Sequence, residues 1–317
     1  MELSTKMKQR FCKDNGLSIQ LFKEPYFTSR LELLGQLDKY TRFKKLIELE
    51  FDGNEEKYFE YYGNLKDNII DFIKESEAYK MMQADKMDKY KCEYDIKQSD
   101  VYKVPNIGEE FISIDMVKAN FSSLVYYGQI NGYKFFDSYN YDEFMGQFTA
   151  KEHFMKSKYI RQVVFGNCCA KKQVAFEKYL MSVVLKALID IVKVDINDVH
   201  SLCSDEIILY ARNITTEQYT MIKNLTLMFK FPLRVERYTL GVVTSETDKS
   251  NINNSNTYAY VKKLGYRDLE LKCVEPINLP FVLKTINDIK ISDEDLYFSH
   301  NGKLAKLIDK PELRLIY

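Results

Sequence analysis

The sequence contains no Trp, and its 317 residues include only three His and six Cys. No two Cys form a Cys-x-x-Cys pair, and so few His argue against a zinc site. Reduced thiols of this kind are typical of a cytosolic or nuclear protein.

The sequence also lacks an excess of charge, because Lys plus Arg and Asp plus Glu both number 46. The whole molecule therefore offers no bulk attraction for nucleic acid, although a local basic face remains compatible with zero net charge. No apolar run reaches the length of a membrane span, and the first ten residues lack the apolar stretch of a signal peptide. We expect an intracellular protein of the cytoplasm or nucleus, neither secreted nor bound to a membrane.

The first part of the chain has helical periodicity. Apolar residues recur at helical spacing between residues 28 and 75, with a break at Asp52-Gly53-Asn54. This pattern predicts a helical hairpin within a mostly helical N-terminal region, 1–104. Residues 80–98 carry charges of alternating sign, which is more typical of a solvated surface than of a nucleic-acid-binding tract.

The character of the sequence changes after residue 105. The patterns predict, in order, a buried strand at 111–114, a helix or turn at 117–127, a long helix at 171–194, a hairpin or bent strand at 199–211, a helix at 215–229 and a strand at 233–243. This is the element order of a ferredoxin-like sheet, so we expect a palm-like domain at 105–250. The residues of the long helix expected to face the core are Val174, Tyr179, Leu180, Val183, Val184, Ala187, Leu188 and Ile191.

The last part of the chain reads as a small, separate unit. Residues 245–256 are polar and rich in Asn, which predicts an exposed loop or domain link. Two strands, a helix at 279–289 and two short strands around Asn301-Gly302 follow, so we expect a thumb-like α+β unit at 251–317. The fold class expected for the chain is α+β.

Two acidic positions stand at the ends of apolar runs. Asp115 ends the run 111–114, and Ser204-Asp205-Glu206 opens the run 207–210. Mg²⁺ prefers carboxylate oxygens and phosphates, so Asp115 and Asp205 are candidate metal ligands. Adjacent strand residues face opposite sides, which makes Glu206 a second choice. The alternative is that these acids cap a helix and form a polar turn.

A basic segment lies between the two acidic positions. Lys158 and Arg161 are three residues apart, so in a helix they would share a face and reach phosphates together. Lys171 and Lys172 continue the positive character, and Phe165-Gly166 allows close backbone approach. A solvated basic face is the alternative.

In combination and order, these segments resemble the three palm motifs of the B family of DNA polymerases. The first family motif ends in Asp followed by Ser-Leu-Tyr, and here Asp115 is followed, after an insertion, by the segment 121–126. The second supplies a Lys before Asn-Ser-x-Tyr-Gly, as Lys158 and Arg161 precede 165–167. The third is Asp-Thr-Asp-Ser, and Cys203-Ser204-Asp205-Glu206 has Cys203 in place of the leading Asp. The chain also looks similar to proteins of large DNA viruses and phages.

The resemblance covers roughly residues 105–275 and implies roles for particular residues. Asp115 and Asp205 would be catalytic and would hold Mg²⁺ or Mn²⁺, with Glu206 assisting. Lys158 and Arg161 would bind the nucleoside triphosphate, and Phe121 or Tyr126 would stack near its sugar. The residues implied to hold nucleic acid are Lys171, Lys172, Tyr258 and Lys272.

Two classes of function follow from these features. The first is a metal-dependent nucleotidyltransferase with a minimal polymerase palm, which transfers a nucleotide from a nucleoside triphosphate and takes part in DNA replication. The second is a catalytically inactive, polymerase-derived protein that binds nucleic acid or acts as a viral replication or host-interaction accessory protein. The departure at Cys203 and the neutral overall charge favour the second class.

Overall fold

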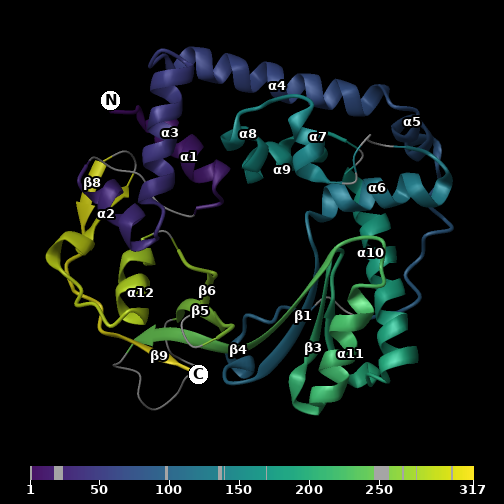
Figure 1. Ribbon diagram of the computed structural model, residues 1–317. Helices are drawn as coiled ribbons and strands as arrows, with labels where there is room; N and C mark the ends of the chain where they lie inside the picture. Colours follow the sequence, from purple (N-terminus) through teal and green to yellow (C-terminus); the bar gives the residue numbers. More distant parts are fainter. Residues whose placement is uncertain are drawn as a thin grey trace. The chain divides into compact units, whose positions relative to one another are not determined.

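A computed structural model describes residues 2–17, 24–96, 99–134, 138, 140–168, 170–245, 257–265, 268–275, 277–300 and 303–317. The chain divides into two compact units (Figure 1). Unit 1 comprises Met1–Asn64, Lys156–Ile160 and Leu240–Tyr317, and unit 2 comprises Leu65–Met155 and Arg161–Thr239. Antiparallel strands and helices build both units, so the class is α+β, as the sequence predicts.

Unit 2 is built on a four-stranded antiparallel sheet. Its strands are β1 (Glu110–Met116), β2 (Val199–Leu202), β3 (Glu206–Tyr210) and the first half of β4 (Leu233–Ser245). They pair in the order β2-β3-β1-β4. Helices separate β1 from β2 and β3 from β4, so the element order and the strand order are both ferredoxin-like, as predicted.

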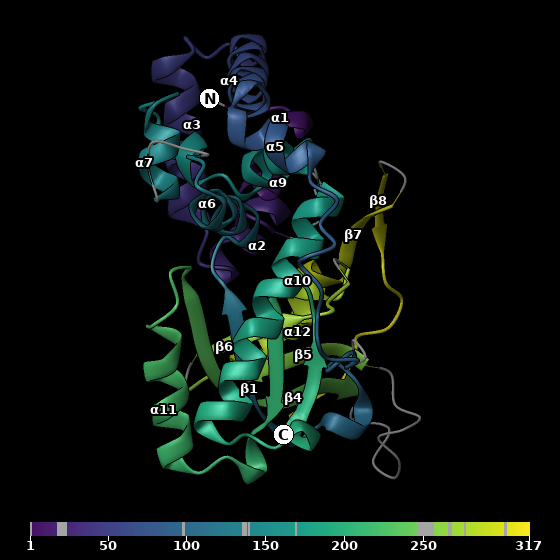
Figure 2. The same cartoon turned by 90° about the vertical axis from the view of Figure 1, so that its right-hand side faces the viewer.

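The helices of unit 2 cover one face of this sheet. α10 and α11 lie on the same side of the strands (Figure 2), and α6 packs on α10. The helices that lie wholly or partly in unit 2 are α4 (Glu55–Glu75), α5 (Glu77–Ala84), α6 (Ala119–Asn131), α7 (Tyr141–Gly146), α8 (Glu152–Lys156), α9 (Lys158–Gly166), α10 (Ala170–Ala187) and α11 (Thr216–Thr226).

The alternation of β1 assigns its side chains to two faces. Ile112 lies opposite Arg237, whose guanidinium carbon is 5.9 Å from the ring centre of Tyr219 on α11. Ile112 therefore faces the helices, together with the buried Ile114. The alternate residues of β1, which end in Asp115, point to the other face.

The predicted core stripe of α10 is partly wrong. Val174 and Val183 are 50% and 38% exposed, and Ile191, in the π-helical turn Leu188–Val192 that follows α10, is 55% exposed, while Gln173 and Glu177 are among the buried residues. Apolar residues occur on several faces of this helix, so periodicity alone did not fix which face turns inward. As a result, Glu177 lies on the buried face of α10.

Unit 1 combines helices from the start of the chain with strands from its end. α3 and α4 form the predicted hairpin, with the break at 51–54. The second half of β4 pairs with β5 and β9, and β5 pairs with β6. The remaining elements of unit 1 are α1 (Thr5–Asp14), α2 (Tyr26–Leu33), α3 (Leu37–Glu50), β5 (Thr257–Lys263), β6 (Leu269–Lys272), α12 (Leu279–Ile286), β7 (Tyr297–His300), β8 (Lys303–Lys306) and β9 (Leu313–Ile316).

The make-up of unit 1 differs from the three consecutive segments 1–104, 105–250 and 251–317 that the sequence suggested. Arg30 of α2 donates a hydrogen bond to the backbone oxygen of Tyr297, 267 residues away, at 2.7 Å. Ser157, at the start of α9, donates to Asp14 of α1 at 2.7 Å. The predicted polar loop at 245–256 lies almost wholly outside the described residues.

No helix within the described part of the chain is long and apolar enough to cross a membrane.

Candidate metal centre at the end of strands β1 and β3

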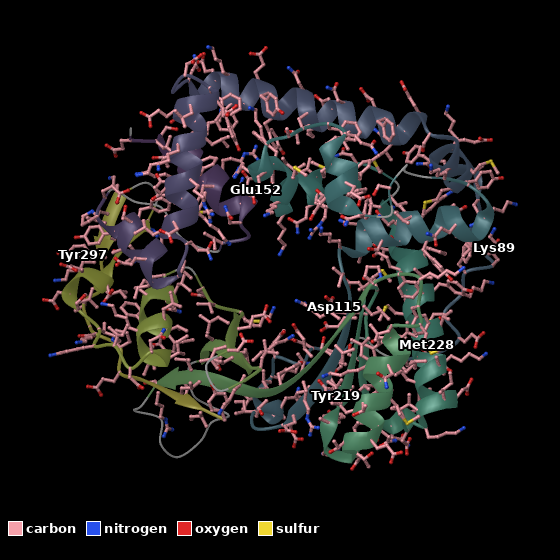
Figure 3. The ribbon with its side chains drawn as sticks, viewed as in Figure 1. Lys89, Asp115, Glu152, Tyr219, Met228 and Tyr297 are labelled. Atoms are coloured by element: carbon pink, nitrogen blue, oxygen red, sulfur yellow. The ribbon has the colours of Figure 1, made fainter. Side chains whose placement is uncertain are left out.

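Strand register in unit 2 places two of the predicted acids opposite one another. Asp115, the next-to-last residue of β1, pairs with Glu206, the first residue of β3, and on its other side with Arg234 of β4. Residues that are directly opposite in an antiparallel pair share a face of the sheet. The side chain of Asp115 lies at this end of the strands (Figure 3).

Asp205 occupies the turn between β2 and β3. Its backbone oxygen accepts a hydrogen bond from the backbone nitrogen of Met116 at 2.8 Å, which joins the turn to the end of β1. The turn is closed by a bond of 2.8 Å from the nitrogen of Cys203 to the oxygen of Glu206. Asp115, Asp205 and Glu206 therefore meet at one edge of the sheet, as the sequence predicts, with Glu206 rather than Asp205 directly opposite Asp115.

Neighbouring polar groups hold these carboxylates in place. Ser113 donates to Glu206 Oε1 at 2.5 Å, and Arg234 Nη2 lies 3.1 Å from Asp115 Oδ2. Arg234 Nε also lies 3.3 Å from Glu236 Oε1. The Asp115 side chain is 28% exposed and that of Arg234 is 57% exposed, so this ion pair is open to solvent.

The surroundings of Asp115 disfavour its negative charge. The pKa of Asp115 is raised from 3.8 to about 6, chiefly by burial and then by the charges of Glu206 and Asp205, against the opposing effect of Arg234. Burial and like charges both favour the neutral acid. A divalent cation would relieve both effects, so the donor set fits Mg²⁺ or Mn²⁺, which take oxygen ligands.

Glu177 of α10 is a fourth acid near this edge, which the sequence patterns missed. It is 5% exposed, and its Oε1 accepts a hydrogen bond from Ser123 of α6 at 3.2 Å. Burial and then the charge of Asp205 raise the pKa of Glu177 from 4.5 to about 7. A signal for the inward orientation of Glu177 was present in the sequence. The apolar residues near it on the same helix are Phe176, Leu180, Met181 and Val184.

Two cations of unit 2 flank Tyr141. The guanidinium carbon of Arg161 is 5.8 Å from the ring centre of Tyr141, and Lys118 Nζ is 4.6 Å from it. Lys118 also lies 2.9 Å from Asp142 Oδ1. Lys118 stands three residues after Asp115 in the left-handed conformation, with φ of 50°, and precedes α6. Arg161 was a predicted phosphate ligand, whereas Lys118 was not.

The two aromatic candidates have different surroundings. Phe121 is 2% exposed and packs against Tyr141, Phe144 and Phe165, with ring centres 5.4, 5.6 and 6.1 Å away. It is a core residue, so its predicted stacking on a sugar is not supported. Tyr126 is half-buried, with its ring 5.2 Å from that of Phe231 in an edge-to-face contact.

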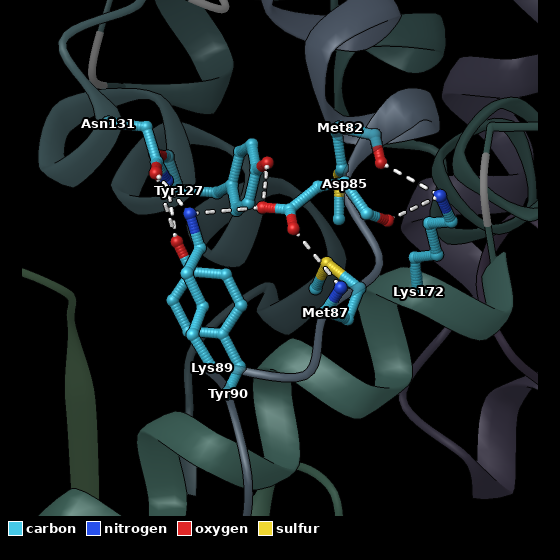
Figure 4. Close-up of polar contacts among 8 residues, drawn as sticks. All are labelled: Met82, Asp85, Met87, Lys89, Tyr90, Tyr127, Asn131 and Lys172. Carbon is cyan, nitrogen blue, oxygen red and sulfur yellow. Dashed lines mark hydrogen bonds and ion pairs between the residues drawn. The ribbon is translucent and has the colours of Figure 1, made fainter.

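Lys172 does not present its charge to a partner outside the protein. Its ammonium donates to the backbone oxygens of Met82, Gln83 and Asp85 at the end of α5, as Figure 4 shows in part. A cation that binds these terminal carbonyls caps the helix. The predicted nucleic-acid contact of Lys172 is therefore replaced by a structural role, whereas Lys171 is exposed.

The same part of unit 2 contains a second polar network around Asp85 (Figure 4). Asp85 Oδ2 accepts from Tyr127 at 2.9 Å and lies 3.2 Å from Lys89 Nζ. Lys89 Nζ donates to Asn131 Oδ1 at 3.0 Å. These bonds join the segment after α5 to α6.

The remaining predicted residues belong to unit 1. Lys158 is exposed and lies against Gly16, where its Cδ would be 3.2 Å from an added Cβ. Tyr258 packs on the buried cluster of Val243, Ala259, Val261 and Val282. Lys272 lies 2.7 Å from Glu270.

As the side chains are placed, no three acidic, His or Cys residues among those described form a group ready to hold a metal ion. Asp115 pairs with Arg234, and Glu206 accepts a hydrogen bond from Ser113.

Comparison with known proteins gives no match to a family model, to a curated protein or to a solved structure. The function must therefore be inferred from the geometry of the two units.

Proposed function

We propose that this chain is a divalent-metal-dependent nucleotidyltransferase, with a palm resembling that of B-family DNA polymerases. The observation that carries the proposal is the strand order β2-β3-β1-β4, with Asp115 opposite Glu206 and Asp205 in the adjoining turn. Three acids meet at a sheet edge where burial and like charge oppose ionisation of one of them. Acids with perturbed pKa values that lie close together are typical of functional sites.

The residues of unit 2 have distinct roles in this reaction. Asp115, Asp205 and Glu206 hold Mg²⁺ or Mn²⁺, which would stabilise the attacking and leaving oxygens of phosphoryl transfer. Arg161, with Lys118, neutralises phosphate charge of the nucleoside triphosphate. Arg234 pairs with Asp115 in this structure, and this ion pair would have to give way for Asp115 to hold a metal ion.

The substrates of such an enzyme are a nucleoside triphosphate and a nucleic-acid strand that supplies the attacking hydroxyl. The reaction fits the cytoplasm or nucleus, where these substrates and reduced thiols occur together. A role in DNA replication, including that of a virus, is compatible with this chemistry.

A second candidate function has its own supporting observation. Asp115 forms an ion pair with Arg234, and Cys203 stands where the resemblance expects an acid. A protein that had lost catalysis could retain this ion pair in place of the metal and serve as a nucleic-acid-binding or host-interaction accessory protein. The two candidates differ in whether nucleotide is incorporated.

Incubation with a primed template, labelled dNTPs or NTPs, and Mg²⁺ or Mn²⁺ tests the choice. We expect incorporation that falls at least about 100-fold in Asp115→Asn, since that change removes a metal ligand. Asp71→Asn, at an exposed position of unit 2, should leave the rate unchanged. Absence of incorporation by the unaltered protein would favour the second candidate, and equal rates in both variants would exclude Asp115 from the reaction.

A further inference from the structure

A row of cations follows one side of α1 in unit 1. Lys6, Arg10 and Lys13 are spaced by four and three residues, so they share one side of the helix. The chain as a whole has no net charge. The positive charge on this side of α1 is therefore a local feature and does not reflect an overall excess of basic residues.

Aromatic rings lie beneath the row. Arg10 sits between the rings of Tyr62 and Tyr159, with its guanidinium carbon 3.9 and 4.7 Å from their centres. Lys6 Nζ is 4.1 Å from the ring centre of Phe59, and Lys13 Nζ is 5.6 Å from that of Tyr159. These contacts hold the cations on one surface.

Lys158 extends the row past the end of α1. Its side chain lies against Gly16, which follows Lys13 by three residues and adopts φ of 66°. The neighbouring Ser157 donates to Asp14 at 2.7 Å, which fixes the start of α9 beside α1. Lys6, Lys13 and Lys158 are all exposed.

Two acids near this surface, Asp14 and Glu55, have other partners. Asp14 is 3% exposed and accepts from Ser157 and from Tyr58. Glu55 accepts from both the backbone nitrogen and the hydroxyl of Ser4. Within the described residues, no ion pair neutralises Lys6, Lys13 or Lys158.

We propose that Lys6, Lys13 and Lys158, the basic row of unit 1, bind the phosphate backbone of a nucleic acid. Three exposed lysines on one surface, two of them against aromatic rings, are suited to a polyanion, and neutralised phosphates release counterions. This surface contains none of the acids of the candidate metal centre, so the proposal assigns nucleic acid to a surface that the proposed function does not include, and it stands without catalysis.

A nucleic acid fits this surface better than an anionic membrane does. Proteins that bind a membrane through a basic helix also insert apolar side chains. The apolar residues of α1 are Met7, Phe11 and Cys12, and all three are buried. The helix therefore offers charge without an apolar anchor.

Binding of a fluorescent single-stranded DNA of about 20 nucleotides to the full chain, in EDTA, tests the proposal. We expect Lys6→Gln/Lys13→Gln/Lys158→Gln to weaken binding at least about tenfold at roughly 0.1 M salt. The slope of log affinity against log salt should fall by about 2, since each lost phosphate contact removes about 0.7. Replacement of the same three lysines by Arg should retain binding.

Lys39→Gln/Lys45→Gln/Lys290→Gln is the matched control, because these three lysines of unit 1 are also exposed. It should bind as the unaltered protein does, and so should Asp115→Asn, which separates this proposal from the catalytic one. Equal weakening by both triple variants would overturn the assignment. So would binding to vesicles containing phosphatidylserine with no binding to the DNA.

Discussion

Asp14 of unit 1 and Glu177 of unit 2 are both buried acids on helices, with 3% and 5% of their surfaces exposed. Asp14 accepts hydrogen bonds from Ser157 and Tyr58, at 2.7 and 3.2 Å, and lies 3.9 Å from the guanidinium of Arg10. Its charge is thus compensated by groups from three segments of the chain. A buried charge with such partners stabilises the arrangement of those segments.

Glu177 has a different environment. Ser123 donates to it, but the nearby charge of Asp205 has the same sign, and burial adds to the cost of ionisation. Asp115 also has like-charged neighbours, Glu206 and Asp205, but it forms an ion pair with Arg234 as well. Burial alone therefore does not define the environment of an acid, because the charges and hydrogen-bond donors around it also count.

Removal of the compensated acid should have the largest effect on stability. Asp14→Ala leaves the half-buried Arg10 without its acidic partner and two hydroxyls without an acceptor. We expect the free energy of unfolding to fall by about 3–5 kcal/mol, measured by urea denaturation.

The matched change is Asp38→Ala on α3, at an exposed position of unit 1. Its effect should stay within about 0.5 kcal/mol. Similar losses of unfolding free energy in the two variants would show that the contacts of Asp14 with its partners do not stabilise the protein.

Removal of Glu177, which has no cation beside it among the groups that shift its pKa, should change the pH dependence of stability. The pKa of Glu177 is raised from 4.5 to about 7, so the folded form holds its proton more tightly than the unfolded form. The associated stability is fully present below about pH 4.5 and declines as the pH rises toward 7, by at most about 3 kcal/mol. In Glu177→Gln the decline measured by urea denaturation in EDTA should be smaller by this amount, while the part due to the raised pKa of Asp115 should remain.

Glu75→Gln, at an exposed position of unit 2, is the control and should retain the decline. A decline of the same size in Glu177→Gln would assign it to another group.

The adjacent lysines Lys171 and Lys172 allow a similar comparison between an exposed charge and one with partners in the protein. The expected effect on stability is smaller. Lys172→Met removes the donor to the three carbonyls at the end of α5 and should cost about 1–2 kcal/mol of unfolding free energy. Lys171→Met, one residue away and exposed, should cost less than about 0.5 kcal/mol. Thermal denaturation of both variants measures the difference, and a larger loss in Lys171→Met would contradict it.

Local patterns in the sequence were sufficient for the main elements of unit 2. The apolar run before Asp115 and the acids that open the run at 207–210 predicted strands whose ends carry carboxylates. The order of strands and helices then predicted the ferredoxin-like sheet. Alternation along one strand is a local property, which is why these predictions were confirmed.

Local sequence patterns could not predict features that depend on contacts between distant residues. The bond between Asp14 and Ser157 joins residues 143 positions apart, and no local pattern indicates it. A local apolar signal for the inward orientation of Glu177 competed with apolar residues on other faces of α10, so the packing against α6 decided it. The role of Lys172 depends on the position of the end of α5.

Binding of Mn²⁺, followed by electron paramagnetic resonance, tests most directly whether the acids of unit 2 form a metal centre. Free Mn²⁺ gives a strong signal that binding diminishes, so the measurement needs neither substrate nor turnover. We expect the unaltered protein and Asp71→Asn to bind Mn²⁺, and Asp115→Asn and Glu206→Gln to bind it at least about tenfold more weakly. Equal binding in all four proteins, or no binding in any, would contradict the assignment of Asp115, Asp205 and Glu206 as metal ligands.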